Sequence, residues 1–364
     1  MLYALPDHQV MDELLPTARR KYLAPDHACS KLQAQPGLVP VAIDPSGQGL
    51  LYFADIGKHP LQEWKFVYTI EKLAREQQIK STFVTDLSLL DHPDLPGDGI
   101  EPFALLFHVS RCGSTLLTKT IARQAHNLTI NQGGPLQEGF WSSITGGFQH
   151  LPEISNSNIH RLRRLVLLLT RARGLRCQRA FVKFISWNII YFDLIKAAFP
   201  EASALYLYRD PAEVIANVMQ ETTAVLRARG EQQSHWLTGL APEQTAAMDE
   251  LSYLASCYAH YFRIAADKSP QTGLRLLNYR DLKQPGQLAD ICKRGLGLRL
   301  RRDEIRQMSE QYRYCSKDDS NKTVFIDDTP AKLRQLGADN RARIDAICAS
   351  SMALLEENAG NLYP

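Results

Sequence analysis

The sequence predicts an α/β protein in which helices flank a central parallel sheet in three layers, preceded by a small α+β region. Three observations predict this fold class. Residues 103–109 form a continuous apolar run, which is typical of a strand buried in a parallel sheet. After this run, short strand-like segments alternate with segments of helical periodicity. The first hundred residues differ, because their apolar runs are short and are broken by proline and glycine.

Two apolar runs near the amino terminus predict a β-hairpin. They lie at 38–43 and 50–53, and the turn-forming sequence Pro-Ser-Gly-Gln-Gly separates them at 45–49. Farther along, apolar side chains recur at helical spacing and predict a helix over residues 64–76. This part of the chain is therefore expected to mix strand and helix.

A segment rich in proline, glycine and aspartate separates the two parts of the chain. It reads DHPDLPGDG at 91–99, a composition typical of a linker. We therefore expect an accessory region of unknown role at 1–100 and an α/β domain at 101–364.

The second domain is expected to alternate strands and helices. Strands are predicted at 103–109, 181–184, 204–208 and 274–278. Helices are predicted at 114–124, 160–172, 187–199, from Pro211 onward, and at 245–267, 285–294 and 331–357. The carboxyl ends of parallel strands meet at one edge of a sheet, and ligands bind there.

Composition and charge exclude several classes of partner. The 364 residues carry 42 Lys and Arg against 39 Asp and Glu, a net charge of +3 that is too small to indicate a nucleic-acid partner. Seven cysteines are scattered without a CxxC pair or zinc-ligand spacing, so we expect a reduced compartment and no metal site. The amino terminus shows no signal-peptide pattern, and no apolar run is long enough to span a membrane. We expect a cytoplasmic protein with no membrane partner.

The segment between the first predicted strand of the domain and the helix after it has the properties of an anion site. It reads Ser110, Arg111, Cys112, Gly113, Ser114 and Thr115. The first backbone N–H groups of a helix are unpaired, and the helix dipole attracts negative charge to them. Gly113 allows close approach of the backbone, and Ser114 and Thr115 add hydroxyl donors. Arg111 adds a planar cation.

This segment is not a Walker A loop. Gly113 and Thr115 match the second glycine and the hydroxyl residue of that motif. His108 stands in place of the first glycine, and Ser114 stands in place of the lysine. Because that lysine holds the β- and γ-phosphates, its loss argues against ATP-dependent phosphoryl transfer.

A second informative segment follows the strand predicted at 204–208. It reads Arg209-Asp210-Pro211, and the proline begins a helix at the position it prefers. An arginine at the carboxyl end of such a strand faces the ligand crevice. The alternative for Arg209 is a salt bridge with Asp210 or Glu213.

Together the two segments resemble the sulfotransferase family. Its phosphosulfate loop reads approximately S-R-[SC]-G-S-T-L-L, which residues 110–117 match, and its 3′-phosphate motif begins R-[DN]-P. The resemblance covers about 103–330. It implies a P-loop-like three-layer fold and transfer of sulfonate from 3′-phosphoadenosine 5′-phosphosulfate (PAPS) to a hydroxyl or amine, with no metal ion.

The resemblance also implies roles for individual residues. The loop at 110–115 would hold the 5′-phosphosulfate, and Arg111 would stabilise the leaving phosphate. Arg209 would bind the 3′-phosphate. The family has a serine eight residues after this arginine, where Asn217 stands here and could bind as an amide.

Two lysines are candidates by their place in the same resemblance. Lys183 matches the basic residue that the family carries between the two motifs, and the alternative is a surface lysine on an edge strand. Lys317 lies where the family often places a basic loop over the nucleotide.

The general base is the least defined part of the predicted site. The histidine that one branch of the family uses after Lys183 is absent. Glu138 is the preferred candidate, and the alternative is a solvated glutamate in a loop. His108 and His126 are further candidates, with a buried structural histidine and a helix cap as their respective alternatives.

The predicted helix at 160–172 belongs to a stretch with seven arginines between residues 160 and 179. An amphipathic helix with a solvated basic face is one interpretation, and an acceptor site for an acidic substrate is the other.

Two other functions compete with that of an active sulfotransferase. One is an inactive relative that binds the nucleotide without turnover, and the other is a P-loop kinase. Binding of nucleotide that depends on Mg²⁺ would indicate the kinase. The acceptor, whether a small molecule, a glycan or a peptide, and the oligomeric state are left open by the sequence.

Overall fold

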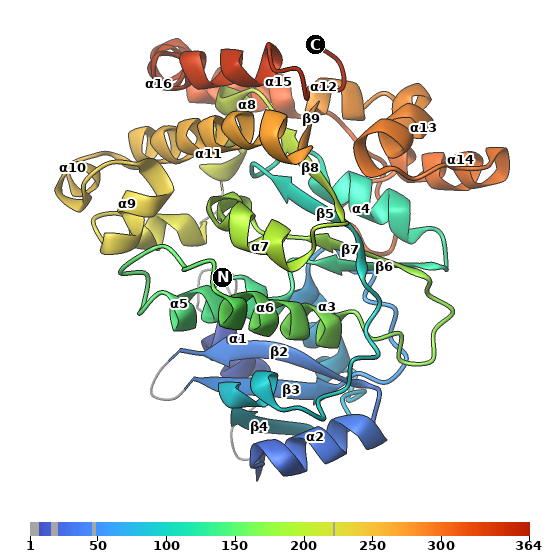
Figure 1. Ribbon diagram of the computed structural model, residues 1–364. Helices are drawn as coiled ribbons and strands as arrows, with labels where there is room; N and C mark the ends of the chain where they lie inside the picture. Colours follow the sequence, from blue (N-terminus) through green and yellow to red (C-terminus); the bar gives the residue numbers. More distant parts are fainter. Residues whose placement is uncertain (1–6, 16–20, 46–48, 221–222) are drawn as a thin grey trace.

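The computed structural model describes residues 7–15, 21–45, 49–220 and 223–364 (Figure 1). Residues 46–48 of the predicted turn, and the first six residues considered for a signal sequence, lie outside these ranges. Within them the chain forms a four-stranded sheet near the amino terminus and a five-stranded parallel sheet after it. The predicted α/β fold with helices around a central parallel sheet is confirmed.

The amino-terminal sheet contains the predicted hairpin. Its strand order is β1-β4-β3-β2, with β1 (Lys21–Tyr22), β2 (Leu38–Asp44), β3 (Leu50–Asp55) and β4 (Thr82–Asp86). β2 and β3 pair antiparallel, as do β3 and β4, whereas β1 runs parallel to β4. The helices of this region are α1 (Asp7–Leu14), α2 (Pro25–Ala34) and α3 (Phe66–Arg75). The helix predicted over 64–76 is thus confirmed as α3.

The second sheet has the strand order β6-β7-β5-β8-β9. Its strands are β5 (Pro102–His108), β6 (Asn127–Asn131), β7 (Arg179–Lys183), β8 (Ser203–Tyr208) and β9 (Arg275–Asn278). The chain leaves the central strand β5 toward β6 on one side, and it leaves β8 toward β9 on the other. Because the connections diverge from two adjacent strands, a crevice opens at their carboxyl ends.

Helices cover both faces of the parallel sheet (Figure 1). α4 (Ser114–Ala122) lies on one face and contacts β6 and α14 (Arg302–Ser309). α7 (Phe192–Ala198) and α11 (Glu250–Thr272) lie on the other face. Other helices are α5 (Gly139–Ile144), α6 (Asn156–Leu169), α8 (Pro211–Val218), α9 (Gln232–Thr238), α10 (Pro242–Ala246), α12 (Tyr279–Leu282), α13 (Leu288–Asp290), α15 (Thr329–Leu336) and α16 (Ala338–Glu356).

Some helices differ from their predicted bounds. The helix predicted over 331–357 is divided into α15 and α16 at Gly337, whose φ of +82° breaks the helix. The helix predicted over 245–267 becomes α11, which begins after Asp249 because that carboxylate accepts a bond from the Ser252 N–H. The segment predicted as a helix at 285–294 is helical throughout, but its geometry changes from a 3-10 turn (Pro285–Gln287) through α13 to a π-helical turn (Ile291–Gly295).

The arginines of α6 and the loop after it connect the two regions. Arg161 binds Asp91, with Nε 2.9 Å from Oδ1, and Arg163 pairs with Glu101. Arg171 is 2% exposed, and it donates to Asp98. The interpretation as a solvated basic face is therefore wrong for Arg171, whereas Arg161 and Arg163 keep side-chain exposures of 32% and 39% within their ion pairs. Among the helices of the described ranges, none combines the length and apolar character needed to cross a bilayer.

Candidate functional site

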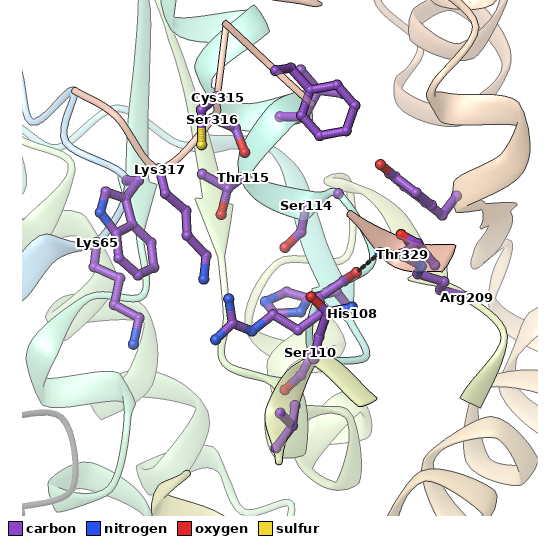
Figure 2. A pocket seen from close by; sticks show the side chains of 18 of the residues that line it. Lys65, His108, Ser110, Ser114, Thr115, Arg209, Cys315, Ser316, Lys317 and Thr329 are labelled. Carbon is purple, nitrogen blue, oxygen red and sulfur yellow. Dashed lines mark hydrogen bonds between the residues drawn. The ribbon is translucent and has the colours of Figure 1, made fainter. Parts of the chain in front are cut away.

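A pocket of about 570 Å³ opens at the carboxyl ends of the central strands. It is lined by His108 at the end of β5, Ser110 just after it, Ile185 after β7 and Arg209 after β8. Figure 2 shows these walls with the loop before α4 at the centre. The pocket therefore occupies the crevice between the diverging connections, where ligands of open α/β sheets bind.

The loop between β5 and α4 is shaped to receive an anion. Arg111 and Gly113 have left-handed backbones, with φ of 58° and 80°. The first backbone bond of α4 runs from Leu117 N–H to Gly113 O (3.1 Å), so the N–H groups of residues 114–116 precede it. Residues 110, 111 and 113–116 line the pocket. We call residues 110–116 the cradle.

Cys112 contributes to the cradle through its backbone only. Its side chain is fully buried, and it is absent from the pocket lining. Burial raises the pKa of the Cys112 thiol to about 12, so the thiol stays neutral. Ser114 and Thr115, in contrast, line the pocket as the sequence predicted.

The structure brings Arg209 directly against the cradle. Its Nη1 donates to the carbonyl oxygen of Arg111 (2.9 Å). Its Nε donates to Glu213 (2.6 Å), and its Nη2 donates to the Thr329 hydroxyl (2.7 Å). The guanidinium also lies 4.3 Å from the ring centroid of Tyr279. Both sequence interpretations are therefore realised, because the side chain faces the crevice and also forms the salt bridge with Glu213.

Asn217 lies in the same wall, and both ends of its amide are engaged. Its Nδ2 donates to the Glu213 carbonyl (2.8 Å), and its Oδ1 accepts from Lys332 Nζ (2.6 Å). Lys332 also pairs with Asp328 (2.7 Å). Lys332 was not predicted as a site residue, because the sequence signal around it is limited to the Thr-Pro pair that starts α15.

Lys183 is buried rather than on the surface. It is 1% exposed and ends β7, and its Nζ donates to the Thr115 hydroxyl (3.3 Å) and the Trp64 carbonyl (3.4 Å). Burial, together with the positive charge of Lys65, lowers the pKa of Lys183 to about 7. The alternative of a surface lysine on an edge strand is therefore wrong, and Lys183 contacts the cradle from its buried side.

Two of the three candidate bases lie at or near the pocket. His108 lines it, and its Nδ1 bonds the Val109 carbonyl (2.8 Å). Burial lowers the pKa of His108 to about 3, so the ring is neutral at physiological pH. His126 lines neither this pocket nor its neighbour, and it stands 3.7 Å from Glu304.

Glu138 lines a second, smaller cavity of about 220 Å³. It forms an ion pair with Arg227 there, and burial raises the pKa of its carboxyl. The two cavities share Trp187 and Ala224 as walls, and the Trp187 indole N–H donates to the carbonyl of Gln137 (3.2 Å). Glu138 is thus not a solvated loop glutamate, since it faces a chamber beside the main pocket.

A strap over the pocket carries Lys317. We define the strap as residues 314–328, which a bridge between Tyr314 and Val324 closes into a loop. Lys317 lines the pocket, as expected from the sequence, with its Nζ 5.3 Å from the ring centroid of Trp64. Lys65 Nζ lies 5.2 Å from the same centroid.

The pocket walls are strongly cationic. The cations are Lys65, Arg111, Arg209, Lys283, Lys317 and Lys332, and the carboxylates are Asp327 and Asp328. Such a lining attracts an anionic ligand. Lys65, which belongs to the first hundred residues, was missed because no local motif marks it. Within the described ranges, no three His, Cys, Asp or Glu side chains are grouped to hold a metal ion.

No family model and no curated protein match the chain. The solved structures similar to it include two sulfotransferases. The sulfotransferase domain of the Synechococcus PCC 7002 olefin synthase superposes with a TM-score of 0.40 and 15% identity, over 70% of this chain and 95% of that one. A sulfotransferase from Alicyclobacillus acidocaldarius gives 0.34 and 15%, over 68% of this chain and 96% of the other. Similarity at this level does not assign an activity.

Proposed function

We propose that this chain is a sulfotransferase that moves sulfonate from PAPS to a hydroxyl or amine of an acceptor. One observation carries the proposal. The Arg209 guanidinium donates to the backbone carbonyl of Arg111, and both arginines line the pocket although they are 98 residues apart in sequence. A ligand with two separate anionic groups fits such a pair better than one with a single charge.

The pocket suits PAPS in size and charge. Its volume of about 570 Å³ lies within the usual range for ligand sites. In the proposal, the cradle binds the 5′-phosphosulfate, as helix N-termini bind phosphate. Arg209 binds the 3′-phosphate together with Lys332, which already donates to Asn217. Binding requires the phosphate to share the donors of Arg209 that now contact Thr329 and Glu213.

The transfer step needs little covalent chemistry from the protein. The acceptor oxygen or nitrogen bonds to sulfur while the bond from sulfur to the phosphate oxygen breaks, and its electron pair stays on the phosphate. Arg111 and the cradle N–H groups neutralise the charge that grows on that oxygen. Lys183 holds the Thr115 hydroxyl in place from the buried side.

The acceptor enters from the smaller cavity in this proposal. That cavity adjoins the pocket at Trp187 and Ala224, and Glu138 lines it. Glu138 takes the proton that the acceptor loses, and its raised pKa brings it closer to the range that suits a general base. The acceptor is a small molecule, or the end of a glycan or peptide.

Nucleotide binding without turnover is the second candidate function. It is favoured by the ion pair between Glu138 and Arg227, which holds the proposed base in a fixed contact. Transfer to a broad panel of phenols, alcohols, amino sugars and tyrosyl peptides separates the two functions, because an inactive relative binds donor and transfers nothing.

Calorimetry with 3′-phosphoadenosine 5′-phosphate (PAP) tests the proposal. We expect PAP to bind at least about tenfold more tightly than AMP, equivalent to about 1.4 kcal/mol, without any need for Mg²⁺. Arg209→Lys should remove most of that difference, because lysine cannot make the same planar contacts. Arg176→Ala, at an exposed arginine, is the control. Equal affinities for PAP and AMP, or Mg²⁺-dependent binding of ATP in preference to PAP, would refute the proposal.

A further inference from the structure

The amino-terminal region supplies part of the pocket wall through residues 63–65. The Asn131 side chain, at the end of β6, donates to the Glu63 carbonyl (3.0 Å). Lys183, at the end of β7, donates to the Trp64 carbonyl (3.4 Å). Because Lys183 also contacts Thr115 of the cradle, the backbone at Trp64 is two hydrogen bonds away from the anion site.

One carboxylate joins this wall to the strap and to α4. Asp319 Oδ1 accepts from the Trp64 N–H (3.1 Å) and from Lys119 Nζ (3.0 Å). Lys119 lies on α4, is 6% exposed, and also donates to the carbonyl of Asp318 (2.9 Å). We call Trp64, Lys119 and Asp319 the latch. It fixes three segments that are far apart in sequence at one corner of the pocket.

The latch sets two ammonium groups beside one indole ring. Lys65 and Lys317 each approach the Trp64 ring centroid, at 5.2 and 5.3 Å. Figure 2 shows both lysines on the side of the cradle opposite Arg209 and Thr329. Two cations that share one ring repel each other, and an anion placed between them and the cradle relieves that repulsion.

We propose that Lys65 and Lys317 bind the sulfonate end of the donor and face the cradle across it, so that the amino-terminal region completes the transfer site. This inference rests on the proposed function. As sulfur passes from the phosphate oxygen to the acceptor, its three remaining oxygens stay negative. The two lysines donate hydrogen bonds to those oxygens and keep their protons, and the acceptor's proton goes to the general base. Asp319 is a positioning residue that acts through Trp64 and the strap.

The charge of Lys65 lowers the pKa of two residues at the cradle and the pocket wall. After burial, it is the main contribution to the lowered pKa of Lys183, and it also lowers the pKa of His108. Lys65 therefore lies close enough to the cradle to act on a ligand there.

Lys65→Met tests the inference by separating PAP from PAPS. PAP lacks the sulfonate, so we expect its affinity to change less than about threefold, while kcat for transfer falls about 100-fold, as on removal of one oxyanion donor. Lys65→Arg should restore part of the rate because it restores the charge. Lys58→Met, at an exposed lysine of the same region, is the matched control.

Asp319→Asn tests the latch. Asparagine still accepts from the Trp64 N–H but loses the ion pair with Lys119, so we expect a smaller fall in kcat and unchanged PAP affinity. The effects of Lys65→Met and Asp319→Asn should be partly non-additive, because Asp319 positions Lys65 through Trp64. Lys65→Gln removes the charge but keeps a polar side chain of similar length. The thermal midpoints of all variants show whether each one is still folded.

The outcomes distinguish this inference from the function on which it rests. If the wild-type chain neither binds PAP nor transfers sulfonate, the proposed function fails, and the inference fails with it. If the wild-type chain transfers sulfonate and folded Lys65→Met transfers at the same rate, only the inference is wrong. An equal loss of PAP affinity and of transfer would also overturn it, because Lys65 would then bind the nucleotide rather than the sulfonate.

Discussion

Burial gives Lys183 properties that its position in the sequence does not reveal. The same lysine on an edge strand would remain charged and solvated, whereas here it is enclosed between β6, the cradle and Trp64. Removal from water disfavours the ammonium form, which lowers its pKa to about 7. A bound anion next to this lysine would favour the ammonium form again.

We therefore predict that PAP binds more weakly as the pH rises above about 7. The free chain loses the Lys183 proton through that range, and the complex retains it, so binding takes up a proton there. Calorimetry in two buffers of different ionisation enthalpy measures this uptake. Lys183→Arg stays charged throughout and should abolish the Lys183 contribution. A pH profile that is identical for both proteins would contradict the assignment.

The turn between β5 and α4 depends on Gly113. A Cβ at this position would lie 2.7 Å from Tyr279 Cδ2 and 2.9 Å from Leu282 Cδ2, and its φ is +80°. A glycine is therefore required here for two reasons: the backbone is left-handed, and α12 packs too closely on the cradle to leave room for a Cβ.

Gly113→Ala should destabilise the fold by about 1–2 kcal/mol for the left-handed backbone and by a further 1–3 kcal/mol, about what overpacking costs. Gly273→Ala is the matched control, since the φ of Gly273 is also left-handed (+72°) and a Cβ added there would meet no other atom within 4 Å. It should show the backbone effect alone. Denaturant unfolding measures both values, and equal losses would show that Tyr279 and Leu282 move aside freely.

The elements predicted correctly are those whose signal is local. β5 was predicted because its apolar run is continuous, and α3 because its apolar side chains have helical spacing. β6 was missed because asparagines occupy both of its ends, and asparagine is depleted in strands. Their amides bond the Ile121 and Glu63 carbonyls, partners that the sequence around β6 does not indicate.

At the scale of the whole molecule, the site residues also divide into those with a local sequence signal and those without one. The cradle and Arg209 lie within two short motifs, so the sequence located them. Trp64 lies before the cradle in the sequence, and Thr329 lies far after it. Only the folded structure places both residues in the pocket wall. Glu138 was named as a candidate base, but the second cavity that it lines was not predicted.

The two regions of the molecule are joined by Arg171. Its guanidinium donates to Asp98 (2.8 Å), within the segment predicted as a linker, and to the carbonyl of Leu32 (3.0 Å). Arg171→Met should lower the free energy of unfolding by about 1.5–3 kcal/mol, because a buried carbonyl loses a charged partner. Arg176→Met, at an exposed side chain, should change it by less than about 0.5 kcal/mol. Denaturant titration followed by circular dichroism makes the comparison, and similar values for the two variants would show that the regions are held together without Arg171.

The pocket wall consists of segments that are synthesised at very different times, since its residues range from Trp64 to Lys332. The β2–β3 hairpin can pair early, whereas Leu106 of β5 waits for Lys183 and Leu205 before it has both neighbours. A nascent chain that has reached residue 300 carries the cradle but not yet Lys317, Thr329 or Lys332. The pocket wall is therefore complete only after Lys332 has been added to the chain.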